Sequence, residues 1–215
     1  MARLGKLLKQ EWLLTALDSY LVTIDDSLRG EPKLLHASWM AGKEEDIYQS
    51  YLGSIGLSQK ESKPIPPRTR RLFDDGFDMQ RRYIRYFREM GILFEPEGWD
   101  EDRGVRYIDA DYGIIGHVDC LVWVPTPEGQ ILVPVELKAR NDQRFKKARH
   151  WPEFNDYHQL QMYIYMSQAP WGYIAPENKN DQDFQPKRIP KNDKVINTAL
   201  TKAANVWNRI AEELA

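Results

Sequence analysis

The spacing of hydrophobic residues along the chain changes from a helical period to a strand-like period and back. Leu and Trp side chains recur every three or four positions over residues 5–21, which predicts an amphipathic helix. A shorter helix is expected over residues 44–52, and a long helix, ended by a glycine, over residues 72–90. Residues 58–71 are polar and rich in proline, which predicts a loop. Residues 1–71 are therefore expected to form an N-terminal helical region.

The centre and the C-terminal part of the chain combine strands with helices. In chain order we expect strands at 105–109, 113–124 and 131–138, a helix at 152–168, a strand at 171–175, a polar and mobile segment at 177–193 and a closing helix at 194–214. This order predicts an α/β or α+β layer in a single domain over residues 1–215, with the core at 72–175 and a loop and closing helix at 176–215.

Composition narrows the class of protein without identifying it. Hydrophobic residues make up 42% of the chain and the formal net charge is −2, which argues for a folded protein and against one that coats nucleic acid by bulk positive charge. The single cysteine, Cys120, excludes an internal disulfide and any site with two or more cysteine ligands. No apolar run reaches the ~18 residues of a membrane span, and charges interrupt the N-terminus too often for a signal peptide, so a cytoplasmic location is expected.

Two acidic residues and a lysine are expected to meet in the central hairpin. The strand at 131–138 is apolar until its end, where Glu136 and Lys138 lie two positions apart and therefore share one face of the sheet. A turn at 125–129 brings Asp119, from the preceding strand, beside Glu136. Two neighbouring carboxylates repel each other, and a bound divalent cation removes this conflict. The sequence therefore predicts a magnesium-type site in which the lysine orients or activates a water molecule.

The pattern Glu-x-Lys is weak evidence by itself, because three copies occur in the chain, beginning at Glu61, Glu136 and Glu177. The first and third copies lie in polar segments, where solvated charges are the expected outcome. Only the middle copy ends an apolar strand and has an acidic partner one hairpin away. We therefore predict chemistry for this copy alone, with a salt-bridged strand end as the alternative.

Three ordered motifs carry a resemblance to a known family. They are Gly116-His117-Val118-Asp119, then Glu136-Leu137-Lys138, then a Gln-x-x-x-Tyr element within residues 158–165. In this order they resemble the PD-(D/E)xK nuclease superfamily, and within it the RecB-like and phage-type exonucleases. The resemblance covers about residues 72–175 and implies a restriction-endonuclease-like α/β core, in which a central mixed β-sheet is flanked by helices. The lone Cys120 excludes the iron–sulfur branch, which needs four cysteines.

The resemblance also implies roles for the central residues. Asp119 and Glu136 bind Mg²⁺ or Mn²⁺ together with the backbone carbonyl of Leu137, and Lys138 positions or activates the attacking water. Many relatives carry Gly-x-x-x-His in an upstream helix, and this histidine adds a metal ligand. Here Gln80 stands at that position, and a glutamine carbonyl binds a hard cation more weakly. Gln80 is therefore either a weak metal ligand or a supporting residue.

The Gln-x-x-x-Tyr motif fits the sequence in two registers. Gln159 with Tyr163 is one pair and Gln161 with Tyr165 is the other, and the two residues of each pair share a helix face. The second pair is preferred, because His158 precedes Gln161 by three residues, as in many relatives. The resemblance gives Gln161 and Tyr165 a role in supporting the site and contacting DNA, and none in binding metal.

Basic residues are concentrated on both sides of the expected site in the sequence. Residues 68–88 hold seven arginines against three aspartates, and residues 138–150 hold six lysines or arginines against one aspartate. Such segments, with aromatic residues between them, suit phosphate contacts and base stacking, although solvated surface charge is the alternative. The residues predicted to contact DNA are Arg81, Arg82, Arg85, Arg140, Arg144, Lys146 and Lys147.

The resemblance implies a deoxyribonuclease that hydrolyses phosphodiester bonds and leaves 5′-phosphate and 3′-hydroxyl ends. The first hypothesis is an exonuclease that acts on DNA ends or single strands, in phage or cellular recombination, repair or DNA processing. The second is a structure-specific or restriction-type endonuclease, and the third is a non-catalytic DNA-binding module on a nuclease scaffold. The resemblance also suggests a homo-oligomer, or a partner protein of recombination or replication.

Overall fold

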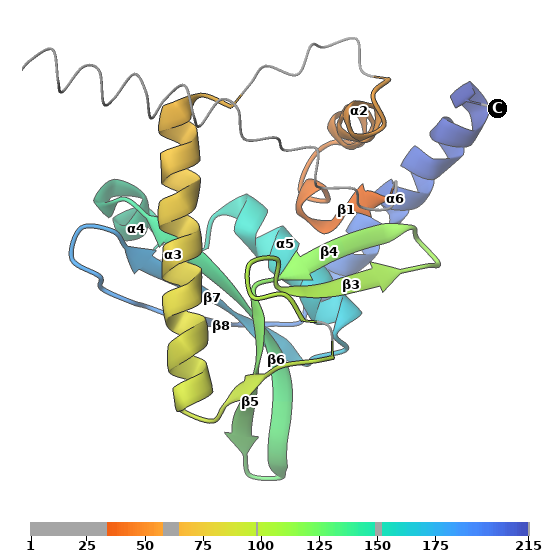
Figure 1. The fold of residues 1–215 in the computed structure, drawn as a ribbon. Helices are drawn as coiled ribbons and strands as arrows, with labels where there is room; N and C mark the ends of the chain where they lie inside the picture. Colours follow the sequence, from red (N-terminus) through yellow and green to blue (C-terminus); the bar gives the residue numbers. More distant parts are fainter. Residues whose placement is uncertain (1–33, 58–64, 98, 149–151, 215) are drawn as a thin grey trace, which may run out of the picture.

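The computed structural model of the chain describes residues 34–57, 65–97, 99–148 and 152–214 (Figure 1). The amphipathic helix predicted over residues 5–21 lies outside these ranges. Within them, helices pack on the faces of two β-sheets, so the predicted α/β fold with a mixed sheet flanked by helices is confirmed. None of the described helices is long and apolar enough to cross a membrane.

The larger sheet has five strands in the order β2-β5-β6-β7-β8. Its strands are β2 (Leu93–Phe94), β5 (Cys120–Thr126), β6 (Gly129–Arg140), β7 (Trp171–Asn178) and β8 (Lys187–Pro190). β6 and β7 pair in parallel, whereas the other neighbours pair antiparallel, so the sheet is mixed. β5 and β6 form the predicted hairpin, whose closed end projects from the body of the molecule in Figure 1.

The smaller sheet has three strands in the order β1-β4-β3, and their bounds are β1 (Leu35–His36), β3 (Val105–Asp109) and β4 (Ile114–Val118). The single strand predicted over residues 113–124 is wrong, because this stretch forms β4 and β5, which belong to different sheets. Asp119 is the residue between them. Buried apolar residues continue on both sides of Asp119, so the hydrophobic pattern gives no sign of the break.

The described helices are η2 (Ala37–Trp39), α2 (Glu44–Ser54), α3 (Pro67–Glu89), α4 (Asp142–Ala148), α5 (Phe154–Met166) and α6 (Asp193–Leu214). Helix α3 begins before its predicted start at Leu72. Pro67 occupies the first helical position, where the missing N–H of proline costs nothing and its backbone angle suits a helix. The loop predicted over residues 58–71 is therefore wrong for its last residues.

Helices α3 and α5 cover opposite faces of the larger sheet. Helix α3 packs against the odd-numbered residues of β6 at 133–137. Apolar residues of α5 pack against Ile174, on the other face of β7. Because side chains alternate along a strand, the even-numbered residues of β6 face α5. Glu136 and Lys138 therefore lie on the α5 face.

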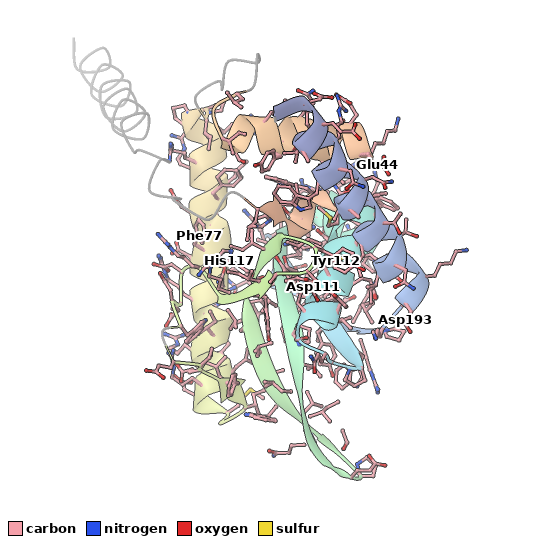
Figure 2. All side chains as sticks on the ribbon, turned by 90° about the vertical axis from the view of Figure 1, so that its right-hand side faces the viewer. Glu44, Phe77, Asp111, Tyr112, His117 and Asp193 are labelled. Atoms are coloured by element: carbon pink, nitrogen blue, oxygen red, sulfur yellow. The ribbon has the colours of Figure 1, made fainter. Side chains whose placement is uncertain are left out.

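Helix α6 confirms the closing helix predicted at 194–214. It packs on α2 and on the smaller sheet in a second hydrophobic core. Figure 2 shows it beside the turn of the β3–β4 hairpin, which carries Asp111 and Tyr112. The indole N–H of Trp207 donates to the Tyr112 carbonyl at 2.8 Å. The same ring approaches Gly113 (φ +58°) so closely that a Cβ there would lie 2.7 Å from it, so this turn needs a glycine.

The polar segment predicted to be mobile at 177–193 is ordered at its start. β7 continues through Glu177 and Asn178, which are 4% and 2% exposed, and β8 then pairs antiparallel with β7. The prediction is wrong because β6 supports the extended β7 along its length, with Arg140 opposite Asn178.

Candidate active site

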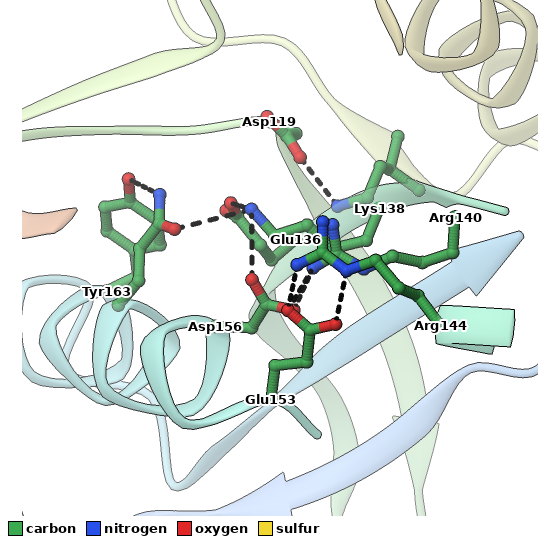
Figure 3. A network of polar contacts seen from close by, with 10 residues as sticks. Asp119, Glu136, Lys138, Arg140, Arg144, Glu153, Asp156 and Tyr163 are labelled. Atoms are coloured by element: carbon green, nitrogen blue, oxygen red, sulfur yellow. Dashed lines mark hydrogen bonds and ion pairs between the residues drawn. The ribbon is translucent and has the colours of Figure 1, made fainter. Parts of the chain in front are cut away.

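Asp119, Glu136 and Lys138 lie together where the β5–β6 hairpin meets the smaller sheet (Figure 3). The backbone N–H of Leu137 donates to Oδ2 of Asp119 at 2.6 Å, and Nζ of Lys138 lies 2.5 Å from Oε1 of Glu136. Glu136 is 2% exposed and the Lys138 side chain is 18% exposed. The structure therefore brings the three predicted residues into one polar cluster, in which Glu136 is buried and Asp119 and Lys138 are half-buried.

The strand register explains why these residues meet. β5 pairs with β6 so that Cys120 lies opposite Val135. Asp119 thus lies just beyond the start of β5, next to Glu136 and Leu137, and its carboxylate accepts the Leu137 N–H that a longer β5 would have used. In an extended strand the N–H and C=O of one residue point to the same side. The Leu137 carbonyl therefore also points to the Asp119 side, as its predicted role as a metal ligand requires.

The cluster holds two carboxyl groups, those of Asp119 and Glu136, and only one basic group, the amine of Lys138, and little solvent reaches it. Burial and then the charge of Asp119 raise the pKa of Glu136 to about 8, against the opposing effect of Lys138. Burial raises the pKa of Asp119 to about 6, opposed by Lys138 and the Leu137 N–H. Burial lowers the pKa of Lys138, but the surrounding carboxylates outweigh this and raise it. The lysine is thus an ammonium at neutral pH, and one ammonium does not balance the two carboxylates.

The residues present fit a hard divalent cation. The second carboxylate oxygen of Glu136, Oε2, is buried and has no hydrogen-bond partner, which is costly unless a cation or water satisfies it. Asp119, Glu136 and the Leu137 carbonyl offer oxygen ligands only, and Mg²⁺ binds through one or two carboxylates while it keeps several waters. Across the described part of the chain, no group of three or more His, Cys, Asp or Glu side chains is placed to hold a metal ion.

Gln80 contacts the turn that holds Asp119 in place. Its side-chain amide donates to the carbonyl of Glu101 at 3.2 Å. The same turn ends at Gly104 (φ +76°), which packs so tightly that a Cβ there would lie 2.2 Å from the carbonyl oxygen of Val118 and 3.2 Å from Cα of Asp119. This contact favours the supporting role for Gln80, whereas its role as a metal ligand stays a prediction.

Helix α5 presents Gln159 and Tyr163 to the cluster. The Gln159 amide donates to the Tyr163 hydroxyl at 2.9 Å, and Oε1 of Gln159 lies 3.4 Å from Nζ of Lys138. Tyr163 is fully buried, and its hydroxyl also forms a hydrogen bond with the His117 backbone. Of the two registers of the Gln-x-x-x-Tyr motif, it is therefore the pair of Gln159 and Tyr163 that lies beside Lys138.

The prediction that Gln161 and Tyr165 face the site is wrong. Gln161 is fully buried and bonds to the Pro190 carbonyl at 2.9 Å and the Asn192 N–H at 2.8 Å, so it joins α5 to the segment between β8 and α6. Burial and then a hydrogen bond to Asp109 raise the pKa of the Tyr165 hydroxyl to about 12. A shift of two residues turns a side chain by about 200° around a helix, so the two registers point to nearly opposite sides.

Asp156 also belongs to the cluster, although no pattern in the sequence predicts it. It lies in the first turn of α5 and is 8% exposed. Its Oδ1 lies 3.8 Å from Nζ of Lys138, and its Oδ2 accepts a hydrogen bond from Arg140. Asp156 precedes Gln159 by three residues and therefore shares its helix face, which is the signal that points to it once the register of Gln159 is known.

Most residues predicted to contact DNA form ion pairs with acidic neighbours. The pairs are Arg81 with Asp102, Arg82 with Glu177, Arg85 with Glu89, Arg140 with Asp156, Arg144 with Glu153 and Lys146 with Asp142. Lys147 is exposed on α4. The positive charge available to DNA is therefore smaller than the composition of these segments indicates, and their contact with DNA stays a prediction.

The glutamate of the third Glu-x-Lys copy, Glu177, is buried and its lysine is partly exposed, so the expectation of solvated charges is wrong for the glutamate. Arg82 donates to both carboxylate oxygens of Glu177, at 2.6 and 2.5 Å, and the Tyr83 hydroxyl donates to one of them at 2.7 Å. Lys179 forms an ion pair with Asp75 at 3.3 Å. Every partner belongs to α3, so this copy fastens α3 to the end of β7.

A mixed sheet flanked by helices, with an Asp–Glu–Lys cluster beside its hairpin, is the arrangement that the resemblance to nucleases implies. The fold is similar to that of an alkaline exonuclease, LHK-Exo, from Laribacter hongkongensis, with a TM-score of 0.59 and 17% identity over 84% of this chain and 89% of that chain. A structure of LHK-Exo in complex with dAMP gives a TM-score of 0.58 and 16% identity over the same shares. No protein-family model matches the sequence, and no curated protein matches it. The likeness confirms the predicted fold, which this chain shares with an exonuclease.

Proposed function

We propose that this protein is a metal-dependent deoxyribonuclease, an exonuclease that hydrolyses phosphodiester bonds and leaves 5′-phosphate and 3′-hydroxyl ends. The observation that carries the proposal is the polar cluster of Asp119, Glu136 and Lys138, in which one carboxylate oxygen lacks a partner. Its fold supports the proposal, because the similar fold belongs to an alkaline exonuclease that also has a structure with dAMP.

Asp119, Glu136 and the Leu137 carbonyl are the residues that would hold the cation, Mg²⁺ or Mn²⁺. When bound, such a cation acts as a Lewis acid, which lowers the pKa of water and neutralises charge on a phosphate. The protein supports this arrangement from two sides. The Leu137 N–H orients the Asp119 carboxylate, and Gln80 holds the turn behind Asp119.

Lys138 donates hydrogen bonds to the attacking water or to a non-bridging phosphate oxygen. As an ammonium it stabilises the negative charge that develops when water attacks phosphorus. The new bond joins the water oxygen to phosphorus, and the bond between phosphorus and the 3′ oxygen breaks. The attacking water gives up a proton to solvent and the leaving 3′ oxygen takes one up from solvent, so the phosphate stays on the 5′ side and a 3′-hydroxyl remains. Gln159, itself held by Tyr163, offers a neutral acceptor to Lys138 from α5.

The DNA strand is proposed to run from the cluster toward α4. Arg140 follows Lys138 by two residues on β6 and therefore lies on the same face of the sheet. Helix α4 begins directly after β6 and carries Arg144, Lys146 and Lys147. The pair of Lys146 with Asp142 is exposed, at 70% and 42%, and such surface pairs are weak, so a DNA phosphate can replace the aspartate.

The test is a cleavage assay with end-labelled linear DNA and closed circular DNA, in Mg²⁺, Mn²⁺ or EDTA. We expect metal-dependent release of nucleotides from linear DNA and no cutting of closed circles. Lys138→Met should abolish cleavage and leave DNA binding largely intact, whereas Lys194→Met, which removes an exposed lysine of α6, should behave as wild type.

Each alternative gives a different result in this assay. Cutting of closed circles favours an endonuclease. Binding of DNA without metal-dependent cleavage of either substrate favours a non-catalytic module on a nuclease scaffold. Full activity of Lys138→Met contradicts the role assigned to the lysine. Sedimentation of the wild-type protein with and without DNA tests the proposed homo-oligomer.

A further inference from the structure

Asp156 is a buried carboxylate that the proposed chemistry does not use. It lies beside Lys138 and Arg140 in the first turn of α5 (Figure 3). Arg140 donates to one of its oxygens, Oδ2, and the other, Oδ1, lies 3.8 Å from Nζ of Lys138. Oδ1 is therefore near the ammonium without forming a close contact with it.

Lys138 has three acceptors around its ammonium group. Oε1 of Glu136 lies 2.5 Å from Nζ, whereas Oε1 of Gln159 lies at 3.4 Å and Oδ1 of Asp156 at 3.8 Å, from two residues of one helix face. A charge-assisted hydrogen bond of an ammonium spans ~2.7–2.9 Å. A shift of Nζ by about 1 Å toward Asp156 is therefore enough to form such a bond with its Oδ1.

Glu136 cannot serve both the ammonium and a divalent cation equally well. Two positive charges a few ångströms apart in a buried place repel strongly, so a cation between Asp119 and Glu136 drives the Lys138 ammonium away from Glu136. A buried charge that loses its partner is costly, so the ammonium needs another acceptor. Asp156 offers a second carboxylate oxygen 3.8 Å from Nζ of Lys138.

We propose that Asp156 is a positioning residue that receives the Lys138 ammonium when a divalent cation engages Glu136. The transfer separates the ammonium from the cation and keeps the lysine beside the reacting phosphate. Arg140 holds the other oxygen of Asp156 and so fixes the carboxylate for this role. The inference rests on the proposed function, because it requires the pair of Asp119 and Glu136 to bind a cation.

The test measures Mn²⁺ binding to the full chain without DNA, by the paramagnetic resonance signal of free Mn²⁺. Asp156→Asn keeps the shape of the side chain and an acceptor for Arg140 but removes the charge, and we expect about tenfold weaker binding. Asp156→Glu should restore most of the affinity. The matched control is Glu153→Gln, which removes a carboxylate paired with Arg140 and Arg144 and should change the affinity by less than about twofold.

The same substitution made in the Lys138→Met variant distinguishes two explanations: movement of the Lys138 ammonium to Asp156, or direct attraction between Asp156 and Mn²⁺. In Lys138→Met no ammonium needs an acceptor, so adding Asp156→Asn should change Mn²⁺ affinity by less than about twofold. A tenfold loss in this background would overturn the proposal, because Asp156 would then act on the cation directly. Unchanged binding by Asp156→Asn in the wild-type background would overturn it as well.

Further variants guard against misfolding and against failure of the proposed function. Asp156→Asn leaves the buried Arg140 with Glu153 as its remaining charged partner, so the double variant Asp156→Asn/Arg140→Met removes the pair together and should show the same tenfold loss. Glu136→Gln should abolish Mn²⁺ binding, and absence of binding by wild type overturns the inference. If wild type binds Mn²⁺ in the expected way but cleaves no DNA, only the proposed function fails. If it cleaves DNA while Asp156→Asn binds Mn²⁺ normally, only the inference fails.

Discussion

Two copies of Glu-x-Lys end neighbouring parallel strands, and only one of them forms a candidate active site. Glu136 on β6 faces α5, whereas Glu177 on β7 is bonded by residues of α3. Both oxygens of Glu177 accept hydrogen bonds from Arg82, and one also accepts from Tyr83. One oxygen of Glu136 accepts from Lys138, and the other has no partner. The Glu177 carboxylate is therefore fully paired, whereas the Glu136 carboxylate keeps one buried oxygen without a partner.

The surroundings of the two strand ends cause this difference. The chain passes between the two sheets at Asp119 and places a second acid against Glu136, so acidic groups outnumber the cation there. The side facing α3 instead supplies an arginine and a hydroxyl to a single carboxylate.

The largest expected difference is in DNA cleavage by variants of the two glutamates. Glu136→Gln removes a proposed metal ligand and should lower metal-dependent cleavage of linear DNA by at least about 10³-fold. Glu177→Gln, the matched change on β7, should leave the activity of the folded protein within roughly threefold of wild type, because Glu177 lies on the other face of the sheet. Initial rates on end-labelled DNA measure both effects, and similar losses in the two variants would contradict the distinction.

Stability without metal should fall as the pH rises. The fold raises the pKa of Glu136 to about 8 and that of Asp119 to about 6, so it favours their protonated forms. This contribution is fully present below the ordinary carboxyl pKa values and is lost as the pH rises through the raised ones. We expect a loss of roughly 3 kcal/mol between about pH 5 and about pH 8 in guanidinium titrations with EDTA.

Two further measurements sharpen this prediction. Glu136→Gln cannot ionise at this position, so most of the pH dependence should disappear in that variant, whereas Glu177→Gln should keep it. Mg²⁺ should restore stability at about pH 8 and have little effect at about pH 5, because protonated carboxyls bind a cation poorly. If the free energy of unfolding of the wild-type protein in EDTA did not change with pH, ionisation of the two carboxyl groups would not destabilise the fold.

Local patterns in the sequence predicted the central cluster but not its surroundings. Asp119, Glu136 and Lys138 could be placed because strand period and a hairpin are local features. The side of α5 that faces the cluster could not, because all residues at 160–164 are buried and the pattern of apolar residues does not distinguish the Gln159 and Gln161 registers. Asp156 was missed for the same reason. The break at Asp119 depends on which strands pair with β4 and β5, and this is decided by tertiary packing.

At a fixed pH, Glu177→Gln should lower the stability of the protein, although it should leave the activity almost unchanged. Glu177→Gln leaves Arg82, whose side chain is 29% exposed, without its carboxylate and should lower the free energy of unfolding by about 2 kcal/mol. Arg82→Met combined with Glu177→Gln should cost less than the sum of the single changes, because it removes the pair together. Urea titrations at neutral pH measure this, and an additive cost would show that the two groups are not coupled.

The lysines of the two copies should differ as well, with the smallest effect for Lys179. Its ion pair with Asp75 involves a lysine side chain that is 25% exposed and an aspartate that is 61% exposed. Exposed pairs of this kind contribute ~0–1 kcal/mol, so Lys179→Met should lower the free energy of unfolding by about 0.5 kcal/mol and leave DNA cleavage unchanged. High salt should remove most of that difference, because it screens the pair. Lys138→Met, the same change on β6, should abolish cleavage, so equal behaviour of the two variants would mean that the Glu-x-Lys copies do not differ in function.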